Sequence, residues 1–195
     1  MNYPLDVRFK ILALAPQIHV IDATGETVCY VKQKLFKLKE LVNVFEDPSR
    51  QKKLCEIKAD RIIDWSASYH FYDANGESFG SVKRRGLRSM WKAHYEVYDE
   101  QESHQGTITE ENPMAKIADA MLSEVPLLGA FSGYFFHPKY VLTTPHGQDI
   151  FRATKRPSMF ESKYVIDKLV ELDPVEELRG LMAYLMMLLL ERTRG

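Results

Sequence analysis

The C-terminal stretch constrains the fold of this chain most: residues 172–195 read LDPVEELRGLMAYLMMLLLERTRG. Asp173 suits the N-cap of a helix, the proline after it suits the first helical position, and Glu176 completes a capping box. In residues 181–190 the only polar side-chain group is the hydroxyl of Tyr184. A helix that is apolar on all sides must be surrounded by protein or by lipid. Its apolar part spans about 15 Å, about half of a bilayer core, so we expect it to be buried inside the protein.

The composition sets the class of protein. The 195 residues are enough for one domain with a substantial core, and we expect a single domain over residues 1–195. The net charge is −1, with 26 basic and 27 acidic residues, so any attraction to an anionic partner must come from a local patch. Cys29 and Cys55 form no disulfide framework and no C-x-x-C pair. The apolar run that follows Asp6 is only five residues long and does not resemble a signal peptide. We therefore expect a cytoplasmic protein.

A hairpin-like pattern occurs twice in the chain, and a weaker third copy follows. Residues 19–34 read HVIDATGETVCYVKQK, residues 70–85 read HFYDANGESFGSVKRR, and residues 141–156 read VLTTPHGQDIFRATKR. Each copy has an apolar or alternating run, a turn that contains glycine, and a second run that ends in Lys or Arg. Turn signals about every ten residues predict an antiparallel sandwich or barrel.

The turns of these copies have a physical reason to form. Asn75 and Gly76 can both adopt positive φ, which a tight hairpin turn requires, whereas the Thr-Gly and His-Gly pairs of the other copies are poorer versions. Asp22 and Asp73 can accept hydrogen bonds from the backbone of their own turns. We therefore assign these aspartates to turn formation rather than to catalysis.

The chain between the hairpins adds further strands and one helix. Strand-like runs cover residues 42–47, 54–58, 62–66 and 105–109. Residues 113–126 read PMAKIADAMLSEVP, with apolar residues at helical spacing and a proline at each end, which predicts a short helix between two halves of a β domain. Closing the sheet removes its free edges and gives the C-terminal helix an interior to occupy.

The phrases VIDATGETVCYVKQK and FYDANGESFGSVKRR are similar to the D-x-x-G hairpins of the LURP-one-related and phospholipid scramblase families. With the mid-chain helix and the apolar last helix, the chain resembles the Tubby C-terminal-like superfamily over residues 17–192. The resemblance implies a mainly β (α+β) fold: a closed antiparallel β-barrel of about twelve strands around a central helix at about residues 174–192. We do not infer scramblase activity for this chain from the resemblance, because the chain lacks a cysteine-rich lipidation cluster and a recognisable calcium loop.

Basic residues at equivalent strand ends are the best functional candidates. They end the second run of each hairpin copy or extend it: Lys32, Lys34, Lys83, Arg84, Arg85, Arg88, Lys92, Lys155 and Arg156. In an up-and-down barrel such ends can share one rim, where they could hold a phosphorylated or carboxylated group. The superfamily resemblance implies phosphoinositide binding through basic residues. The alternative is that these residues only form a solvated face and guard strand ends.

Motifs for catalysis, metals and cofactors are weak. Residues 129–133 read GAFSG, which has the wrong spacing for G-x-S-x-G. The six histidines form no H-x-H or H-E-x-x-H pair, and no P-loop or dinucleotide fingerprint occurs. We therefore expect no cofactor, no metal site and no nucleic-acid partner.

Three functions stay open at this point. The first is a non-enzymatic protein that binds anionic phospholipid headgroups or another anionic ligand through the basic rim, in the cytoplasm or attached peripherally to a membrane. The second is a protein-interaction scaffold or adaptor without a lipid ligand, and the third is an enzyme whose site the sequence does not reveal. A deep pocket that reaches the last helix would favour ligand binding, and a smooth barrel would favour the adaptor.

Overall fold

The structure is a computed structural model, and it describes residues 1–10, 17–32, 41–61, 67–85, 93–111, 138–157 and 161–192. The predicted mid-chain helix, the GAFSG segment and the strand-like run at residues 62–66 lie outside the described residues. So do three of the predicted site residues, Lys34, Arg88 and Lys92.

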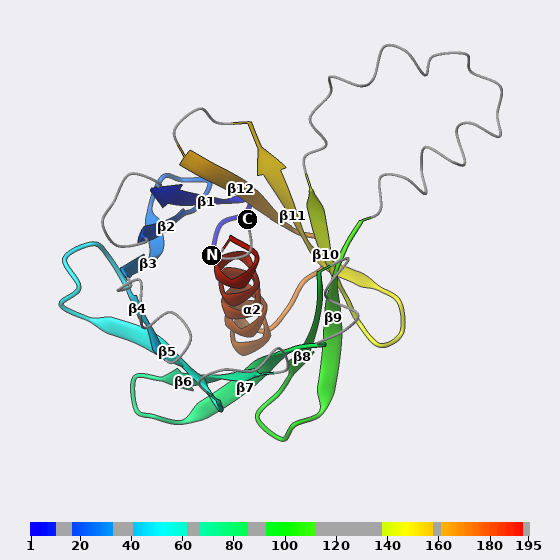
Figure 1. Ribbon diagram of the computed structural model, residues 1–195. Helices are drawn as coiled ribbons and strands as arrows, with labels where there is room; N and C mark the ends of the chain where they lie inside the picture. Colours follow the sequence, from blue (N-terminus) through cyan, green and yellow to red (C-terminus); the bar gives the residue numbers. More distant parts are fainter. Residues whose placement is uncertain are drawn as a thin grey trace, which may run out of the picture.

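Twelve antiparallel strands close into a barrel (Figure 1). They are β1 (Leu5–Lys10), β2 (Gln17–Ile21), β3 (Thr27–Lys32), β4 (Leu41–Phe45), β5 (Lys53–Ala59), β6 (Ser68–Asp73), β7 (Ser78–Arg84), β8 (His94–Tyr98), β9 (His104–Glu110), β10 (Lys139–Thr143), β11 (Asp149–Arg156) and β12 (Glu161–Lys168). Each strand pairs with the strands before and after it, and β1 pairs with β12 to close the ring. The predicted closed barrel of about twelve strands is confirmed.

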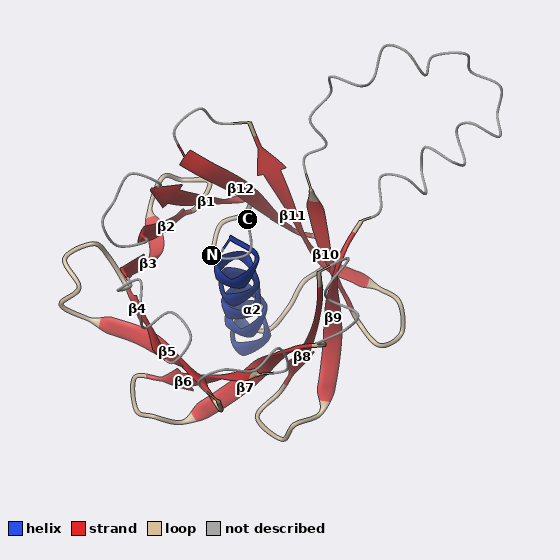
Figure 2. Ribbon diagram, in the orientation of Figure 1, coloured by secondary structure: helices blue, strands red, loops and turns tan. Residues whose placement is uncertain are grey.

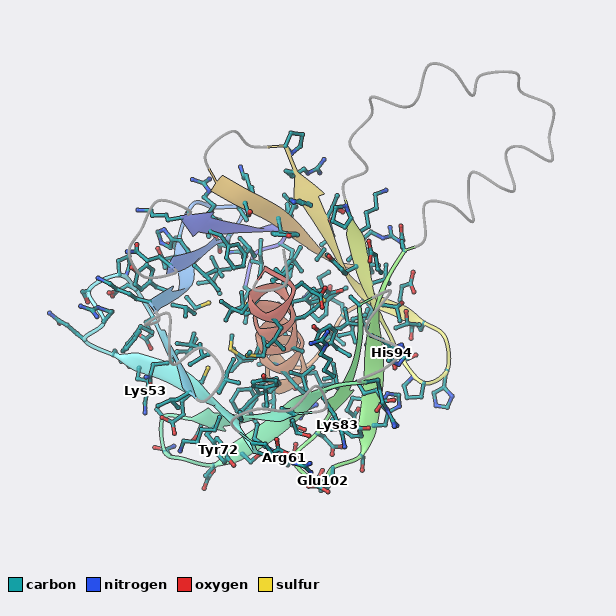
Figure 3. All side chains as sticks on the ribbon, viewed as in Figure 1. Lys53, Arg61, Tyr72, Lys83, His94 and Glu102 are labelled. Carbon is teal, nitrogen blue, oxygen red and sulfur yellow. The ribbon has the colours of Figure 1, made fainter. Side chains whose placement is uncertain are left out.

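The strands form because apolar and polar residues alternate along them. In β1, Leu5, Val7 and Phe9 are buried, while Asp6 and Arg8 between them are partly exposed. This period of two points every second side chain into the barrel. The same alternation occurs in β4 and β8. Figure 3 shows that the inward side chains fill the space between the strands and the central helix.

The helix α2 (Pro174–Arg192) fills the barrel, and Figures 1 and 2 show it at the centre of the ring. Oδ1 of Asp173 accepts hydrogen bonds from the backbone N–H groups of Val175 and Glu176 at 2.8 and 2.9 Å, so Asp173 is the N-cap. From residue 181 to residue 189 every side chain is at most 3% exposed. The expectation of a helix that is buried on all sides is confirmed.

Polar and sulfur atoms also anchor α2 inside the barrel. The hydroxyl of Tyr184 donates to the carbonyl oxygens of Tyr140 and Phe151, at 3.1 and 3.0 Å. Sγ of Cys55 lies 3.3 Å from Sδ of Met182. Cys29 and Cys55 are both buried free thiols, and burial raises the pKa of each. They therefore serve as small apolar fillers of the core.

The three hairpin copies share one turn geometry. Gly25, Gly76 and Gly147 have φ of 88°, 85° and 86°, and each N–H donates to the carbonyl oxygen three residues earlier, at 3.0, 3.1 and 3.0 Å. The prediction of positive φ at Asn75 was wrong, because the loop is longer than two residues and only its glycine is left-handed. In each copy only the glycine needs a positive φ, so the Thr-Gly and His-Gly turns are not poorer than the Asn-Gly turn.

The aspartates form their turns as predicted. Oδ1 of Asp73 accepts hydrogen bonds from the backbone N–H groups of Asn75 and Glu77, at 2.9 and 2.8 Å. Oδ1 of Asp22 accepts the hydroxyl hydrogen of Thr24 at 2.6 Å. This hydrogen bond, with others from Asn2 and from the backbone, outweighs desolvation and lowers the pKa of Asp22 to about 2. Both aspartates are therefore engaged in their turns.

The up-and-down order gives the barrel two different ends. At the turn end, six short connections span residues 22–26, 46–52, 74–77, 99–103, 144–148 and 169–173. At the loop end, the odd-numbered strands finish, the even-numbered strands begin, and α2 ends. The turn-end connections hold two basic residues, Arg50 and Lys52, and ten acidic ones: Asp22, Glu26, Glu46, Asp47, Glu77, Asp99, Glu100, Glu102, Glu171 and Asp173. The turn end is therefore strongly acidic, although the net charge of the chain is only −1.

Candidate functional site

The structure brings the predicted basic strand ends to the loop end but spreads them around it. Lys32 ends β3, Arg84 ends β7 and Arg156 ends β11, and all three strands run in the same direction. Four strand spacings of about 4.8 Å separate each from the next, or roughly 19 Å along the wall. Figure 1 shows β3, β7 and β11 at three separate points of the ring. A single small headgroup therefore cannot touch all three.

Two of the predicted residues around the end of β7 are paired or buried. Nε of Arg85 lies 2.8 Å from Oε1 of Glu96, and Lys83 lies opposite Glu96 in the β7–β8 register. Arg84 is only 9% exposed. Burial raises the pKa of the nearby Tyr69, and the positive charge of Arg84 lowers the same pKa. Arg85 is therefore engaged by Glu96 and Arg84 is buried, so neither is readily available to a ligand.

A basic arc forms instead along β11, β12, β1, β2 and β3, which are consecutive around the barrel (Figure 1). We define the basic arc as Lys10, Lys32, Lys155 and Arg156. Gln17 lies opposite both Lys10 and Lys32 in the register, so these lysines are two strand spacings apart, about 10 Å. Lys10, Lys32 and Arg156 are exposed, and Lys155 is half-buried. The arc therefore places four cations along one side of the loop end.

Lys10 was missed by the sequence analysis. It ends β1, which belongs to no hairpin copy, so the repeat does not mark it. Closure of the barrel places β1 between β12 and β2, and this places Lys10 midway between β11 and β3. The signal that could have found it is strand parity, because every odd-numbered strand of an up-and-down barrel ends at the same rim.

Cations beside the arc are neutralised locally, whereas those of the arc are not. Nη2 of Arg8 lies 2.7 Å from Oδ2 of Asp6, and Nζ of Lys163 lies 3.0 Å from the same oxygen. Within the described part of the chain, no carboxylate forms an ion pair with any residue of the basic arc. The positive charge of the arc is therefore available to solvent or to a ligand.

The positive potential of the arc acts on His19 of β2. Nε2 of His19 lies 3.0 Å from Oγ1 of Thr27, and the residue is opposite Arg8 in the register. Burial lowers the pKa of His19, and the charges of Lys10 and Arg8 lower it further. His19 therefore reports on the charge at this side of the barrel.

A pocket of about 300 Å³ opens at the loop end beside the arc. Its wall comes from β1, β10, β11 and β12, and Leu188 and Glu191 of α2 also line it. Lys155 of the basic arc lines the same pocket. The pocket thus reaches the last helix, which is the feature expected of a ligand-binding barrel rather than of a smooth one.

The pocket combines a cation, hydroxyl groups and a carboxylate. The hydroxyl of Tyr95 donates to Oε1 of Glu191 at 2.5 Å, which orients this carboxylate. Burial raises the pKa of Tyr140, and the charges of Tyr164, Glu110 and Glu191 raise it further. Tyr140 thus keeps its proton at neutral pH and stays a hydrogen-bond donor. The pocket can therefore accept an anionic group beside Lys155 and a hydroxyl or amine beside Glu191.

The comparisons with known proteins agree with this fold. The family model described as LURP-one-related matches residues 27–126, which are 100 of the 195 residues. The chain belongs to the LURP-one-related family. The resemblance inferred from the hairpin motifs is therefore confirmed, although it does not identify a ligand.

A solved structure has the same fold as this LURP-one-related chain. The X-ray structure of a protein from Arabidopsis thaliana aligns with a TM-score of 0.50 at 11% sequence identity, over 98% of this chain and 93% of that chain. At this identity the likeness concerns the fold alone. No curated protein matches the chain.

Two further observations concern the part of the chain that the structure describes. No grouping of three or more His, Cys, Asp or Glu in this part of the chain could hold a metal ion. The helices that the structure describes include none with the length and apolar character of a membrane span.

Proposed function

We propose that this LURP-one-related barrel is a non-enzymatic binding protein whose loop end docks on an anionic phospholipid surface. The observation that carries the proposal is the basic arc, whose four cations lie along one side of the loop end and one of which, Lys155, lines a pocket of about 300 Å³. The arc supplies the attraction to the surface, and the pocket accepts one headgroup. Peripheral attachment to a membrane from the cytoplasm is part of the same proposal.

The expected strength of this attraction is moderate. Each Lys or Arg close to an anionic membrane contributes about 1 kcal/mol, and the attraction falls off within a Debye length of about 8 Å at physiological ionic strength. Binding should therefore be reversible and sensitive to salt. The acidic turn end is repelled by the same surface, so the charge distribution orients the barrel with its loop end toward the lipid.

Flotation with vesicles tests the proposal. One set of vesicles contains phosphatidylserine with phosphatidylcholine, and the other contains phosphatidylcholine alone. The arc variant carries Lys10→Ala, Lys32→Ala and Arg156→Ala. The control variant carries Arg50→Ala, Lys52→Ala and Lys53→Ala at the turn end, and it loses the same charge from the same residue types.

The expected result is salt-sensitive binding to the anionic vesicles only. Three lost contacts at about 1 kcal/mol each weaken the partition of the arc variant on the order of 100-fold, and the control variant binds at least as well as the parent protein. Equal binding of the arc and control variants would remove the arc from the proposal. Absence of any salt-sensitive lipid binding would favour the adaptor without a lipid ligand.

A further inference from the structure

A second pocket, of about 210 Å³, lies at the opposite end of the barrel. It opens between the wall formed by β8 to β11 and the first turns of α2. Its buried part is apolar and includes Leu142, Ile150 and Phe151, which are 3%, 9% and 1% exposed. Glu171 and Glu176 line its outer part. We call it the turn-end pocket.

The size of the turn-end pocket points to a side chain rather than to a whole ligand. Small-molecule sites have volumes of about 300–1,000 Å³, and this pocket is smaller. Interfaces between proteins commonly place one large apolar side chain of the partner in a buried pocket, where it supplies much of the affinity. A volume of about 210 Å³ with an apolar base suits such an anchor.

Exposed apolar residues occur at the turn end of the barrel, where the pocket opens. Among the described residues, the exposed large hydrophobic side chains are Met1, Leu169 and Val175. Leu169 and Val175 are the sequence neighbours of pocket-lining residues, and the amino group of Met1 lies 4.0 Å from Glu177 at the start of α2. Exposed apolar groups gathered at one place are typical of interaction surfaces. Exposed apolar side chains thus occur at the same end of the barrel as the pocket.

The charge around the pocket selects the partner. The lining residue Arg179 is engaged: its Nε donates to the carbonyl oxygen of Phe79 at 2.7 Å, and its Nη2 donates to Glu100 at 3.0 Å. Lys168 pairs with Glu171 at 3.3 Å. Against these two cations stand five acidic residues of the two connections that adjoin the pocket, β8–β9 and β12–α2: Asp99, Glu100, Glu102, Glu171 and Asp173. The net field is negative, and it favours a cationic partner.

We propose that the turn-end pocket is a docking site for a basic peptide segment of a partner protein. One leucine or phenylalanine side chain of the segment fills the pocket, and its flanking lysines or arginines face the acidic β8–β9 and β12–α2 connections beside it. This inference does not depend on lipid binding at the loop end. With both sites in use, the barrel joins a partner protein to a membrane.

Fluorescence anisotropy with labelled synthetic peptides tests the site on the full chain. The probe peptide has a central leucine between lysines, and two comparison peptides replace the leucine with alanine or the lysines with glutamate. Leu142→Phe fills the pocket, and Glu171→Lys reverses a charge at its mouth. Glu26→Lys makes the same charge change at an exposed position of the β2–β3 connection, on another side of the turn end, and serves as the control.

The expected result is that the leucine–lysine peptide binds and both comparison peptides bind more weakly. Leu142→Phe weakens binding roughly tenfold or more, Glu171→Lys weakens it roughly threefold, and Glu26→Lys leaves it unchanged. Circular dichroism checks that Leu142→Phe is folded. If it is not folded, the comparison of Glu171→Lys with Glu26→Lys tests the proposal. No binding of the probe, or equal losses in Glu171→Lys and Glu26→Lys, would overturn the proposal. So would self-association that Leu142→Phe abolishes in sedimentation, because the occupant would then be a second copy of the chain.

Discussion

Single residues with a left-handed backbone recur in the turn-end connections. Gly25, Gly76 and Gly147 take this conformation at no steric cost. Arg50 and Glu102 take it in two further connections, with φ of 59° and 61°. A side chain in this region costs roughly 1 kcal/mol or more, so the fold stores strain at these two positions.

Replacing such a side chain with glycine should stabilise the protein. We expect Glu102→Gly to raise the free energy of unfolding by up to about 1 kcal/mol, measured by chemical denaturation, because relief of the left-handed strain exceeds the cost of the larger unfolded-state entropy of glycine. The matched opposite change is Gly76→Ala, which should lower it by a similar amount. An added Cβ at Gly76 meets no atom within 4 Å, so only the backbone can cause the loss. A destabilised Glu102→Gly would show that its side chain makes a contact worth more than the strain.

At the scale of elements, α2 determines how closely the barrel wall can pack. Gly180 lies where the helix meets β11, and a Cβ at this position would overlap the ring of Phe151. The glycine is therefore a packing requirement, although it lies inside a helix, where alanine is intrinsically favoured by about 1 kcal/mol. The tight contact sits beside the turn-end pocket, so the helix cannot move outward without changing that site.

This close contact makes Gly180→Ala a sharp test of the packing. Overpacking of a core costs about 1–3 kcal/mol, which exceeds the gain in helix propensity. We expect a net loss in the free energy of unfolding of about 1 kcal/mol. The double variant with Phe151→Leu should recover part of this loss, because the overlapping ring is gone, and the two changes should be non-additive. Additive losses would mean that the ring is not the obstacle.

At the scale of the whole molecule, the barrel is electrically polar although its net charge is only −1. The turn end is acidic, and one side of the loop end carries the basic arc. Such a distribution orients a protein in the field of a charged surface more than it raises the overall affinity. His19, close to the arc, gives a direct way to measure the field there.

We expect the pKa of His19 to rise when a cation of the arc is removed or neutralised. Lys10 is one of the charges that lower this pKa, after burial, so Lys10→Ala should raise it in the free protein. A short-chain anionic phospholipid should raise it as well, because an anion stabilises the protonated imidazole. NMR titration of the His19 ring measures both effects, with a zwitterionic lipid of the same chain length as the control. An unchanged pKa with the anionic lipid would place any bound anion away from the arc.

The elements that the sequence predicts well are those with local causes. The capping box at Asp173, the apolar run after Gly180 and the alternation along β1 involve neighbours within a few residues. Asp22 and Asp73 bond to the backbone of their own turns. These interactions recur wherever the same short pattern occurs, so the hairpins and the buried helix could be predicted without coordinates.

The tertiary structure decided what depends on residues far apart in the chain. Pairing of β1 with β12 brought Lys10 between β11 and β3 and created the arc. The register of β7 with β8 placed Arg84 opposite the buried Tyr95. Barrel closure around α2 formed one pocket beside Glu191 and another beside Glu176. The sequence by itself determined the strands, the turns and a helix that had to be enclosed. Which side chains then met could not be predicted, because that follows from barrel closure and strand register, which no local pattern encodes.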